Sequence, residues 1–440
     1  MPSPMRNAPE PDEASPTAPA VVGSSKPRLA GFLGAGLITG ASDDDPSGIA
    51  TYSQVGAAFG YGLSWTLFFS YPLMVAIQMI SARIGRTTGQ GIAGVLRRHY
   101  PNWLVQGVVA LLLLANVANL GADLGAMADA TCLLLPGPKW LYVLLFSAIC
   151  IAMQMFLQYS RYVAVLKWFT VSLFAYLAVL VVAHVQWRAL ALQFFIPHIQ
   201  WNAAYLVAVV AIFGTTISPY LFFWQSEEEV EDMHTHPTRR SLIDAPDQAP
   251  QALRRIRLDT MVGMGLSNAV ALAILATAAA TLHRNGIVDI QTSAQAAQAL
   301  QPFAGRFAAV LFTCGIIGTG LLAVPVLAGS AAYAIGEARS WPVGFSRKLS
   351  EAKAFYLTIS VATVLGMVIN FTSINAMKAL YWSAVINGVI AVPVMVVVML
   401  VVSRSDIMGT FVARGWLRAL GWLATAVMSV IAVAMAVTSI

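Results

Sequence analysis

The stretch GASDDDPSGIA, residues 40–50, places three consecutive carboxylates, Asp43, Asp44 and Asp45, immediately before a proline. Apolar, glycine-rich sequence flanks it on both sides, with LAGFLGAGLIT at residues 29–39 and TYSQVGAAFGYGLSW at residues 51–65. The acids therefore fall inside a segment that is long and apolar enough to cross a membrane. Because charge is costly inside a bilayer, acids at that depth indicate a functional site by default.

The whole chain has the composition of a polytopic membrane protein. Of its 440 residues, 58% are hydrophobic and only 10% are charged, whereas a globular domain carries about a quarter charged residues. Residues 1–27 are rich in proline, alanine and serine and lack an apolar signal core, so we expect a disordered cytoplasmic tail. In residues 28–440 we predict an all-α domain of eleven transmembrane helices, at residues 29–59, 62–83, 103–133, 140–157, 163–184, 203–232, 257–282, 307–335, 354–371, 376–402 and 416–439.

Lysine and arginine fall mainly on one side of this predicted topology. With the N-terminus inside, the outer segments hold only Lys139, Arg188, Arg284, Arg306 and Lys378 of the 26 basic residues. This bias predicts a cell (inner) membrane protein with a cytoplasmic N-terminus and an external C-terminus. The same distribution of lysine and arginine explains the net charge of +6. We therefore expect no nucleic-acid partner. The oligomeric state stays open.

Two of the predicted spans are interrupted. In the first, Pro46 removes a backbone donor and disfavours helix at Asp45. In the sixth, FGTTISPY at residues 213–220 carries Gly214 and Pro219 among polar groups. Non-helical backbone at membrane depth survives only where it is buried in protein or lines a wet cavity. Breaks five spans apart indicate an inverted-repeat secondary transporter with its site at the midplane. Its repeats would lie at about 29–184 and 203–402, with an extra helix at about 416–439.

A cation is the natural ligand for these breaks. Carboxylates, carbonyls and hydroxyls are hard oxygen donors that suit magnesium, calcium or manganese. Asp45 precedes the proline and should lie at the break itself. Asp43 and Asp44 either supply further ligands or have a solvated or structural role. In the second case they line the inner mouth, face solvent, or stay partly protonated because adjacent carboxylates repel each other. Tyr52 and Gln54 are candidates for orienting Asp45, and Asn387 in YWSAVINGVIAVP would either reach the ion or bond a neighbouring helix.

The segments DPSGIATYSQVGAAFGYGLSW, residues 45–65, and ISARIGRTTGQGIAGVLR, residues 80–97, resemble the NRAMP (natural resistance-associated macrophage protein) divalent-metal transporters. The resemblance implies the LeuT-like fold, five plus five helices and one more, and metal uptake into the cytoplasm. It implies Asp45 as the family aspartate and the Thr215 carbonyl as a ligand. The metal would be the substrate, with no cofactor.

The chain departs from the family pattern at five positions of interest. Gly48 replaces an asparagine, Ser218 a methionine and Tyr220 a histidine. Loss of the thioether favours hard ions and resembles the NRAMP-related magnesium transporters. In the third span Asp123 fits a family acid, either as proton carrier or as buried structural group. Asn116 and Ala126 stand where glutamates are usual, which suggests weak or absent proton coupling.

The sequence therefore predicts an NRAMP-like secondary transporter of Mg²⁺ or Mn²⁺. Its metal ligands would come from Asp45, Thr215, Ser218, Gly48 and Asp44. The alternatives are an amine or other organic-cation carrier on the same fold, and a non-transporting receptor whose output is the acidic segment SEEEVEDMHTHPTRR, residues 226–240. We expect that acidic segment to be a solvated helix end. No nucleophile–base pair indicates an enzyme.

Overall fold

The computed structural model describes residues 39–40, 42–156, 174–182, 185–236 and 238–438, and these residues contain helices and no β-strand. The α-helices are α2 (Pro46–Phe59), α3 (Trp65–Thr88), α4 (Ile92–His99), α5 (Asn102–Cys132), α6 (Lys139–Phe156), α8 (Phe174–Val182), α9 (Trp187–Phe195), α10 (Ala203–Thr216), α11 (Pro219–Thr235), α12 (Ala249–Thr281), α13 (Ser293–Gln298), α14 (Gln301–Ala304), α15 (Ala308–Arg339), α16 (Lys353–Ile369), α17 (Ala376–Ser403), α18 (Ser405–Met408) and α19 (Gly415–Thr438). Short 3-10 turns occupy Pro246–Gln248, His283–Asn285, Gly305–Phe307 and Gly409–Phe411.

The long helices reproduce the predicted spans. Eight of them, with α10 and α11 taken as one, are long and apolar enough to cross a membrane, and the shorter α16 coincides with the predicted ninth span. Parts of the first and fifth predicted spans lie outside the described residues, as does the tail at residues 1–27. The count of eleven and the repeat boundaries therefore stay predictions.

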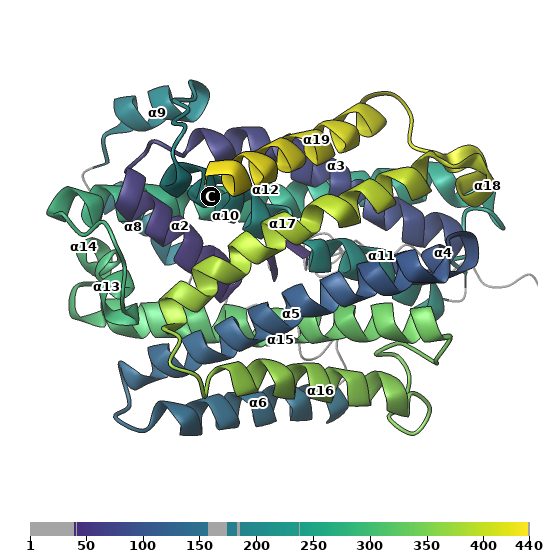
Figure 1. Cartoon of the computed structure of the whole chain (residues 1–440), viewed down its shortest axis with the longest axis horizontal. Coiled ribbons are helices and arrows are strands. Elements are labelled where there is room, and N and C mark those ends of the chain that lie inside the picture. The colour runs from purple at the N-terminus through teal and green to yellow at the C-terminus, as the bar shows by residue number, and fades with distance from the viewer. Residues whose placement is uncertain (1–38, 41, 157–173, 183–184, 237, 439–440) are drawn as a thin grey trace, which may run out of the picture.

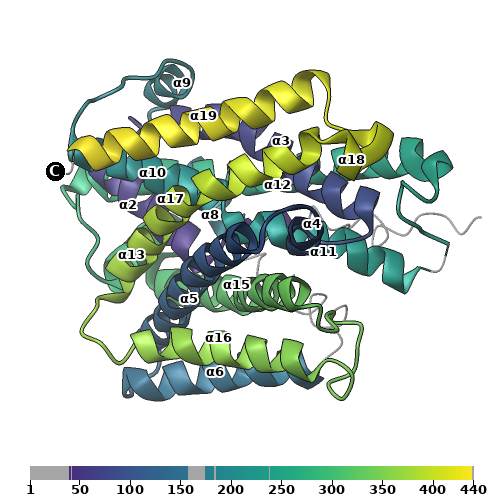
Figure 2. The ribbon, with the colours of Figure 1, turned by 45° about the vertical axis from the view of Figure 1, so that its right-hand side comes forward.

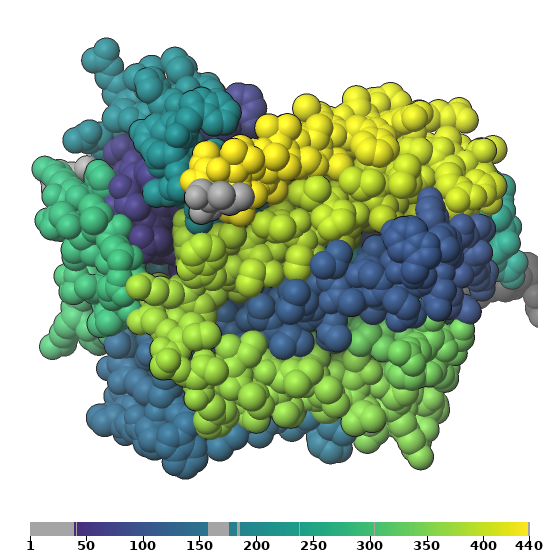
Figure 3. Space-filling model, viewed as in Figure 1, coloured from purple at the N-terminus to yellow at the C-terminus, as the bar shows by residue number. Residues whose placement is uncertain are grey.

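The helices form a bundle with distinct ends (Figure 1). Helices α9, α13 and α14 lie at one end, and α4 and α18 lie at the other. Helix α5 packs against α15, α16 and α17, whereas α2 packs against α12, and α10 packs against α17. Figure 2 shows α4 beside α11 and above α15. In the space-filling view of Figure 3, α5, α16, α17 and α19 cover one face of the bundle.

Both predicted interruptions are present. Residues 42–43 are helical, Asp44 and Asp45 are not, and α2 begins at Pro46. Helix α10 ends at Thr216, and α11 begins at Pro219 after extended backbone at Ser218, where φ is −81° and ψ is 133°. In each break the proline occupies the first turn of the second half-helix, where its fixed φ is favourable and its missing N–H costs nothing.

Close backbone packing holds the second break in place. Gly214 lies so close to α17 that an added Cβ would overlap the backbone of Ala384 and Gly388. Gly388 in turn faces Val210 and Gly214. The small side chains let α10 and α17 approach closely, as is common between membrane helices.

Candidate ion site at the two helix breaks

Asp45 lies where the two breaks meet. Its Oδ1 accepts a hydrogen bond from the backbone N–H of Gly48 at 2.6 Å, which caps α2. The Tyr220 hydroxyl, at the start of α11, lies 3.4 Å from Asp45 Oδ2 and 3.2 Å from the Ser42 carbonyl oxygen. Asp45 and Tyr220 are both 1% exposed. The carboxylate is therefore held from both half-helices and is removed from bulk solvent.

The prolines explain why hydroxyls are needed here. In a regular helix the Ser42 carbonyl would accept from residue 46 and the Thr215 carbonyl from residue 219, but proline has no N–H. Tyr220 donates to the first of these carbonyls. The Ser218 hydroxyl lies 2.9 Å from the second and 2.8 Å from the Gly214 carbonyl. Each carbonyl retains a lone pair, so the breaks offer oxygen ligands beside Asp45.

Gly48 lies directly against Thr215. A Cβ added to Gly48 would lie 3.1 Å from Thr215 Oγ1 and 3.4 Å from Asp45 Oδ1. The structure thus brings together Asp45, Gly48, Thr215, Ser218 and Tyr220, all of which sequence reasoning had named. A larger residue at position 48 would occupy the space between the two breaks.

Asp43 and Asp44 direct their carboxylates toward α12. The Ser267 hydroxyl lies 2.6 Å from Asp43 Oδ2 and 3.3 Å from Asp44 Oδ1. Asp43 Oδ1 has no hydrogen-bond partner among the described residues. Sequence reasoning missed Ser267, because a single serine in an apolar helix is common and only the fold places it beside these acids.

Asp123 on α5 interacts electrostatically with Asp45. It is completely buried, and the Ser47 backbone N–H acts on it, although neither carboxylate oxygen has a full hydrogen bond within the described part of the chain. Asn116, about two turns earlier, has a structural contact, because its amide donates to the Leu327 carbonyl and Ser330 hydroxyl at 2.8 Å each. Asp123 is therefore available to a proton or cation, whereas Asn116 ties α5 to α15.

Two other candidates differ in their surroundings. The Asn387 side chain is 1% exposed, and neither amide atom has a hydrogen-bond partner in the described ranges. Gln54 is occupied elsewhere, since it donates to the Val288 carbonyl at 3.2 Å and accepts from the Ile290 N–H at 2.8 Å. Gln54 therefore anchors the loop around Val288 and Ile290, and these contacts give it no part in orienting Asp45.

The electrostatics of the site favour a cation. Asp43, Asp44, Asp45 and Asp123 are all at most 4% exposed. None of them takes part in an ion pair with lysine, arginine or histidine among the residues described. Carboxylates buried without a counter-charge must acquire a proton or a cation. Those residues include no cluster of three or more His, Cys, Asp or Glu side chains arranged to hold a metal, so a metal here would depend on backbone and hydroxyl oxygens as well.

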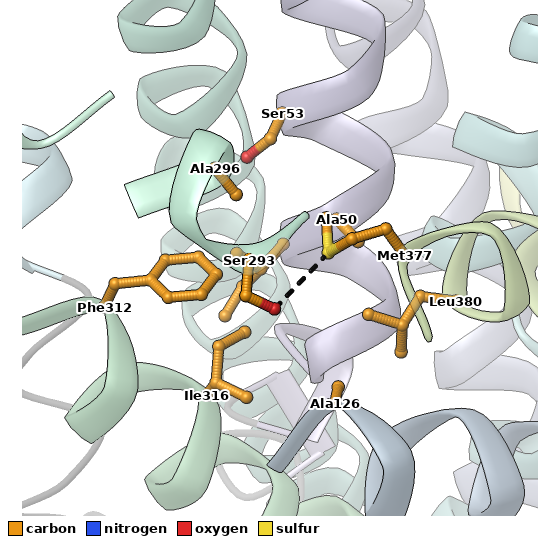
Figure 4. Close-up of a pocket in the computed structure, with 10 residues that line it drawn as sticks. Ala50, Ser53, Ala126, Ser293, Ala296, Phe312, Ile316, Met377 and Leu380 are labelled. Atoms are coloured by element: carbon orange, nitrogen blue, oxygen red, sulfur yellow. Dashed lines mark hydrogen bonds between the residues drawn. The ribbon is translucent and has the colours of Figure 1, made fainter. Parts of the chain in front are cut away.

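Side chains of α2, α13 and α17 pack closely together (Figure 4). A gap lined by Ala50 and Ser53 of α2, Ser293 of α13 and Met377 of α17 is too narrow for a water molecule. The Ser293 hydroxyl lies 3.9 Å from the Met377 sulfur and 2.5 Å from Asp129 Oδ2. Side chains from α2, α13 and α17 thus leave no room for water at this point of the bundle.

The first part of the acidic segment is buried, contrary to the sequence-based expectation of a solvated helix end, whereas His234, Thr235 and His236 are exposed. Glu227 and Glu229 are each 1% exposed. Glu229 pairs with Arg255 of α12 at 2.5 Å, and Asp232 pairs with Arg239. The sequence pattern of a charged helix end was misleading, because nothing in the local pattern shows that Arg255 of the following helix, α12, pairs with Glu229.

The sequence matches the family model "Natural resistance-associated macrophage protein-like" (Nramp) over residues 36–438. The chain belongs to this family. Curated Nramp relatives include the divalent metal cation transporter MntH of Deinococcus radiodurans, 27% identical over 90% of this chain and 87% of the relative. MntH of Klebsiella pneumoniae is 26% identical over 90% and 91%.

Solved structures confirm the LeuT-like fold. The manganese transporter of Eremococcus coleocola superposes with a TM-score of 0.73 at 17% identity, covering 92% of this chain and 85% of that chain. Mhp1, a nucleobase-cation-symport-1 family transporter, superposes with a TM-score of 0.56 at 12% identity, covering 93% and 92%. The chain is therefore a multi-pass membrane protein of the Nramp family, for which the metal is the substrate and no separate cofactor is indicated.

Proposed function

We propose that this Nramp-family chain carries divalent metal cations across the inner membrane into the cytoplasm by alternating access, without enzymatic activity. The observation that carries the proposal is the meeting of the two breaks at Asp45, where Tyr220 of α11 contacts both Asp45 and Ser42. Movement of either half-helix would change the oxygens around a bound ion, which is the requirement for alternating access.

Asp45 is the principal ligand in this proposal. The Thr215 carbonyl supplies a second oxygen, since Pro219 leaves it without a helical N–H. The Ser218 hydroxyl contacts the ion or a bound water, and backbone oxygens near Gly48 complete the shell. Asp44 contributes only if its carboxylate leaves Ser267, which lies 3.3 Å away. Asp43 also contributes only if its carboxylate leaves Ser267, which lies 2.6 Å away. Asn387 reaches the ion when α17 moves.

The donor set favours Mg²⁺ or Mn²⁺. All of these groups present oxygen, which hard cations prefer, and Ser218 offers no sulfur for softer metals. Asp123 is the buried acid of α5 that interacts with Asp45, and the Asn116 side chain is hydrogen-bonded to α15. A single remaining acid supports transport with weak or no proton coupling.

Uptake into proteoliposomes tests the proposal. The purified protein should accumulate Mg²⁺ and Mn²⁺, Asp45→Ala should abolish both, and an imposed pH gradient should change the rate little. Asp406→Ala, at an exposed position far along the chain in α18, serves as control. Uptake of an organic amine without metal uptake would instead support the amine carrier, and metal binding without flux would support a receptor.

A further inference from the structure

A second pair of acids converges at the N-terminus of α4, about two helical turns along α11 from the second break. Glu337, near the end of α15, accepts hydrogen bonds from the backbone N–H groups of Gly91 and Gly94 at 2.8 Å each. These are among the first donors of α4, which have no partner within the helix. Glu337 therefore fixes α4 to α15 at the end of the bundle that the basic residues assign to the cytoplasm.

Glu227 of α11 enters the same space. A Cβ added to Gly91 would overlap Glu227 Oε1 and would lie 2.6 Å from Glu337 Oε2, so the two carboxylates lie side by side over Gly91. Glu227 is 1% exposed, and its Oε1 accepts no hydrogen bond from an N–H or hydroxyl group of the described residues. The two carboxyl groups are close enough for Glu337 to act on Glu227 by charge. A hydrogen bond between them, which would relieve that repulsion, requires a proton on one of the two groups.

The surrounding charges do not remove this requirement. On α11 itself Glu231 adds negative charge to Glu227 and accepts from the Tyr333 hydroxyl of α15 at 2.6 Å. On α4 the nearest cation is Arg97, which acts on Glu337. Arg255 of α12 and Arg86 of α3 act on Glu229 and Asp232, on another face of α11. Two adjacent carboxylates in such a setting cannot both ionise without strong repulsion.

We infer that Glu227 and Glu337 form a proton-binding site that locks α11 to α15 and α4. The shared proton closes this end of the bundle, and its loss leaves two negative charges facing each other and drives α11 away. Helix α11 begins at Pro219, beside the candidate ion site, so its displacement would open a route from that site. The consequence for transport rests on the proposed function, whereas the proton site itself does not.

Two measurements on the full-length protein in detergent or nanodiscs test the site without metal. Infrared spectra should contain a protonated-carboxyl band that Glu227→Gln removes. Hydrogen exchange of the α4 amides, corrected for intrinsic base catalysis, should accelerate roughly tenfold or more from about pH 6 to about pH 9, as expected when local opening becomes easier. In Glu227→Gln the amide donates the same hydrogen bond without a titratable proton, so α4 should stay protected at both pH values.

Glu351→Gln is the control, because Glu351 is exposed in the loop after α15 at the same end. It should keep both the carboxyl band and the pH-dependent exchange. The inference would be overturned if hydrogen exchange of the α4 amides in the wild type did not change with pH. It would also be overturned if Glu227→Gln kept both the protonated-carboxyl band and the pH-dependent exchange. Neither the infrared nor the exchange measurement depends on metal uptake. A failed transport assay would therefore not affect the proton site, and failure of the proton site would not affect the proposed transport.

Discussion

The hydroxyl of Tyr220 lies 3.2 Å from the Ser42 carbonyl and 3.4 Å from Asp45 Oδ2, and so joins the two broken helices. Pro46 has no N–H to donate to that carbonyl. The hydroxyl of Tyr220, the residue immediately after Pro219, donates to it instead. The same side chain thus satisfies the first break and touches the acid on which the ion site depends.

Tyr220→Phe should lower the free energy of unfolding by about 1–3 kcal/mol, the usual cost of leaving a buried polar group unsatisfied. Denaturant titration of the detergent-solubilised protein measures this loss. Tyr176→Phe is the matched control, because Tyr176 is buried and its hydroxyl has no hydrogen-bond partner among the described residues. Equal losses in the two variants would contradict the bridging role of Tyr220.

Ser218→Met should shift uptake toward Mn²⁺ and Cd²⁺ relative to Mg²⁺, since a thioether favours softer ions. Ser218→Leu has nearly the same bulk without sulfur and gives up the same hydrogen bonds to Gly214 and Thr215. Competition among the three ions in proteoliposomes provides the ratio. If the leucine variant shifts as far as the methionine variant, bulk rather than ligand chemistry controls selectivity.

Arg255→Met should destabilise the fold by about 3–5 kcal/mol, because it leaves a buried carboxylate without its partner. Glu229 is that carboxylate, 2.5 Å from Arg255. The double variant Glu229→Met/Arg255→Met should recover much of the loss. Arg254→Met, at an exposed neighbouring position, should change thermal stability little, and a comparable loss there would exclude the ion pair as the cause.

Gly91→Ala should displace α4, although Gly91 itself has φ of −68°, which any residue adopts. The obstacle is space, since the added methyl group would overlap the Glu227 carboxylate. Overpacking of this kind costs about 1–3 kcal/mol. Gly107→Ala on α5 has nothing within 4 Å of the new Cβ and should be neutral or stabilising, so similar unfolding midpoints for the two variants would contradict the crowding at Gly91.

The helix breaks were predictable because their causes are local. Pro46 and Pro219 fall in apolar runs, and proline has the same effect on a helix wherever it occurs. The neighbours Asp45, Gly48, Thr215, Ser218 and Tyr220 could then be named from sequence position and family resemblance alone. Their individual contacts are consistent with the predicted site, although their roles as ligands stay predictions.

The partners contributed by distant helices could not be predicted. Ser267 beside Asp43, and Arg255 beside Glu229, come from α12, and no local pattern links them to the acids. The acidic end of α11 was misread for the same reason, since a run of glutamates near a basic loop has the pattern of a solvated surface. Gln54 is close to Asp45 in sequence, but helix α2 places it against the loop at Val288.

The position of a bound ion tests the central claim most directly. Crystals of the protein soaked or grown with Mn²⁺ should give an anomalous peak within roughly 2.0–2.6 Å of an Asp45 oxygen, the range of hard-cation ligand distances, and beside the Thr215 carbonyl. Asp45→Asn crystals grown identically should lack the peak. A strong peak elsewhere in the bundle, or one that persists in Asp45→Asn, would contradict the assignment of the two helix breaks as the metal site.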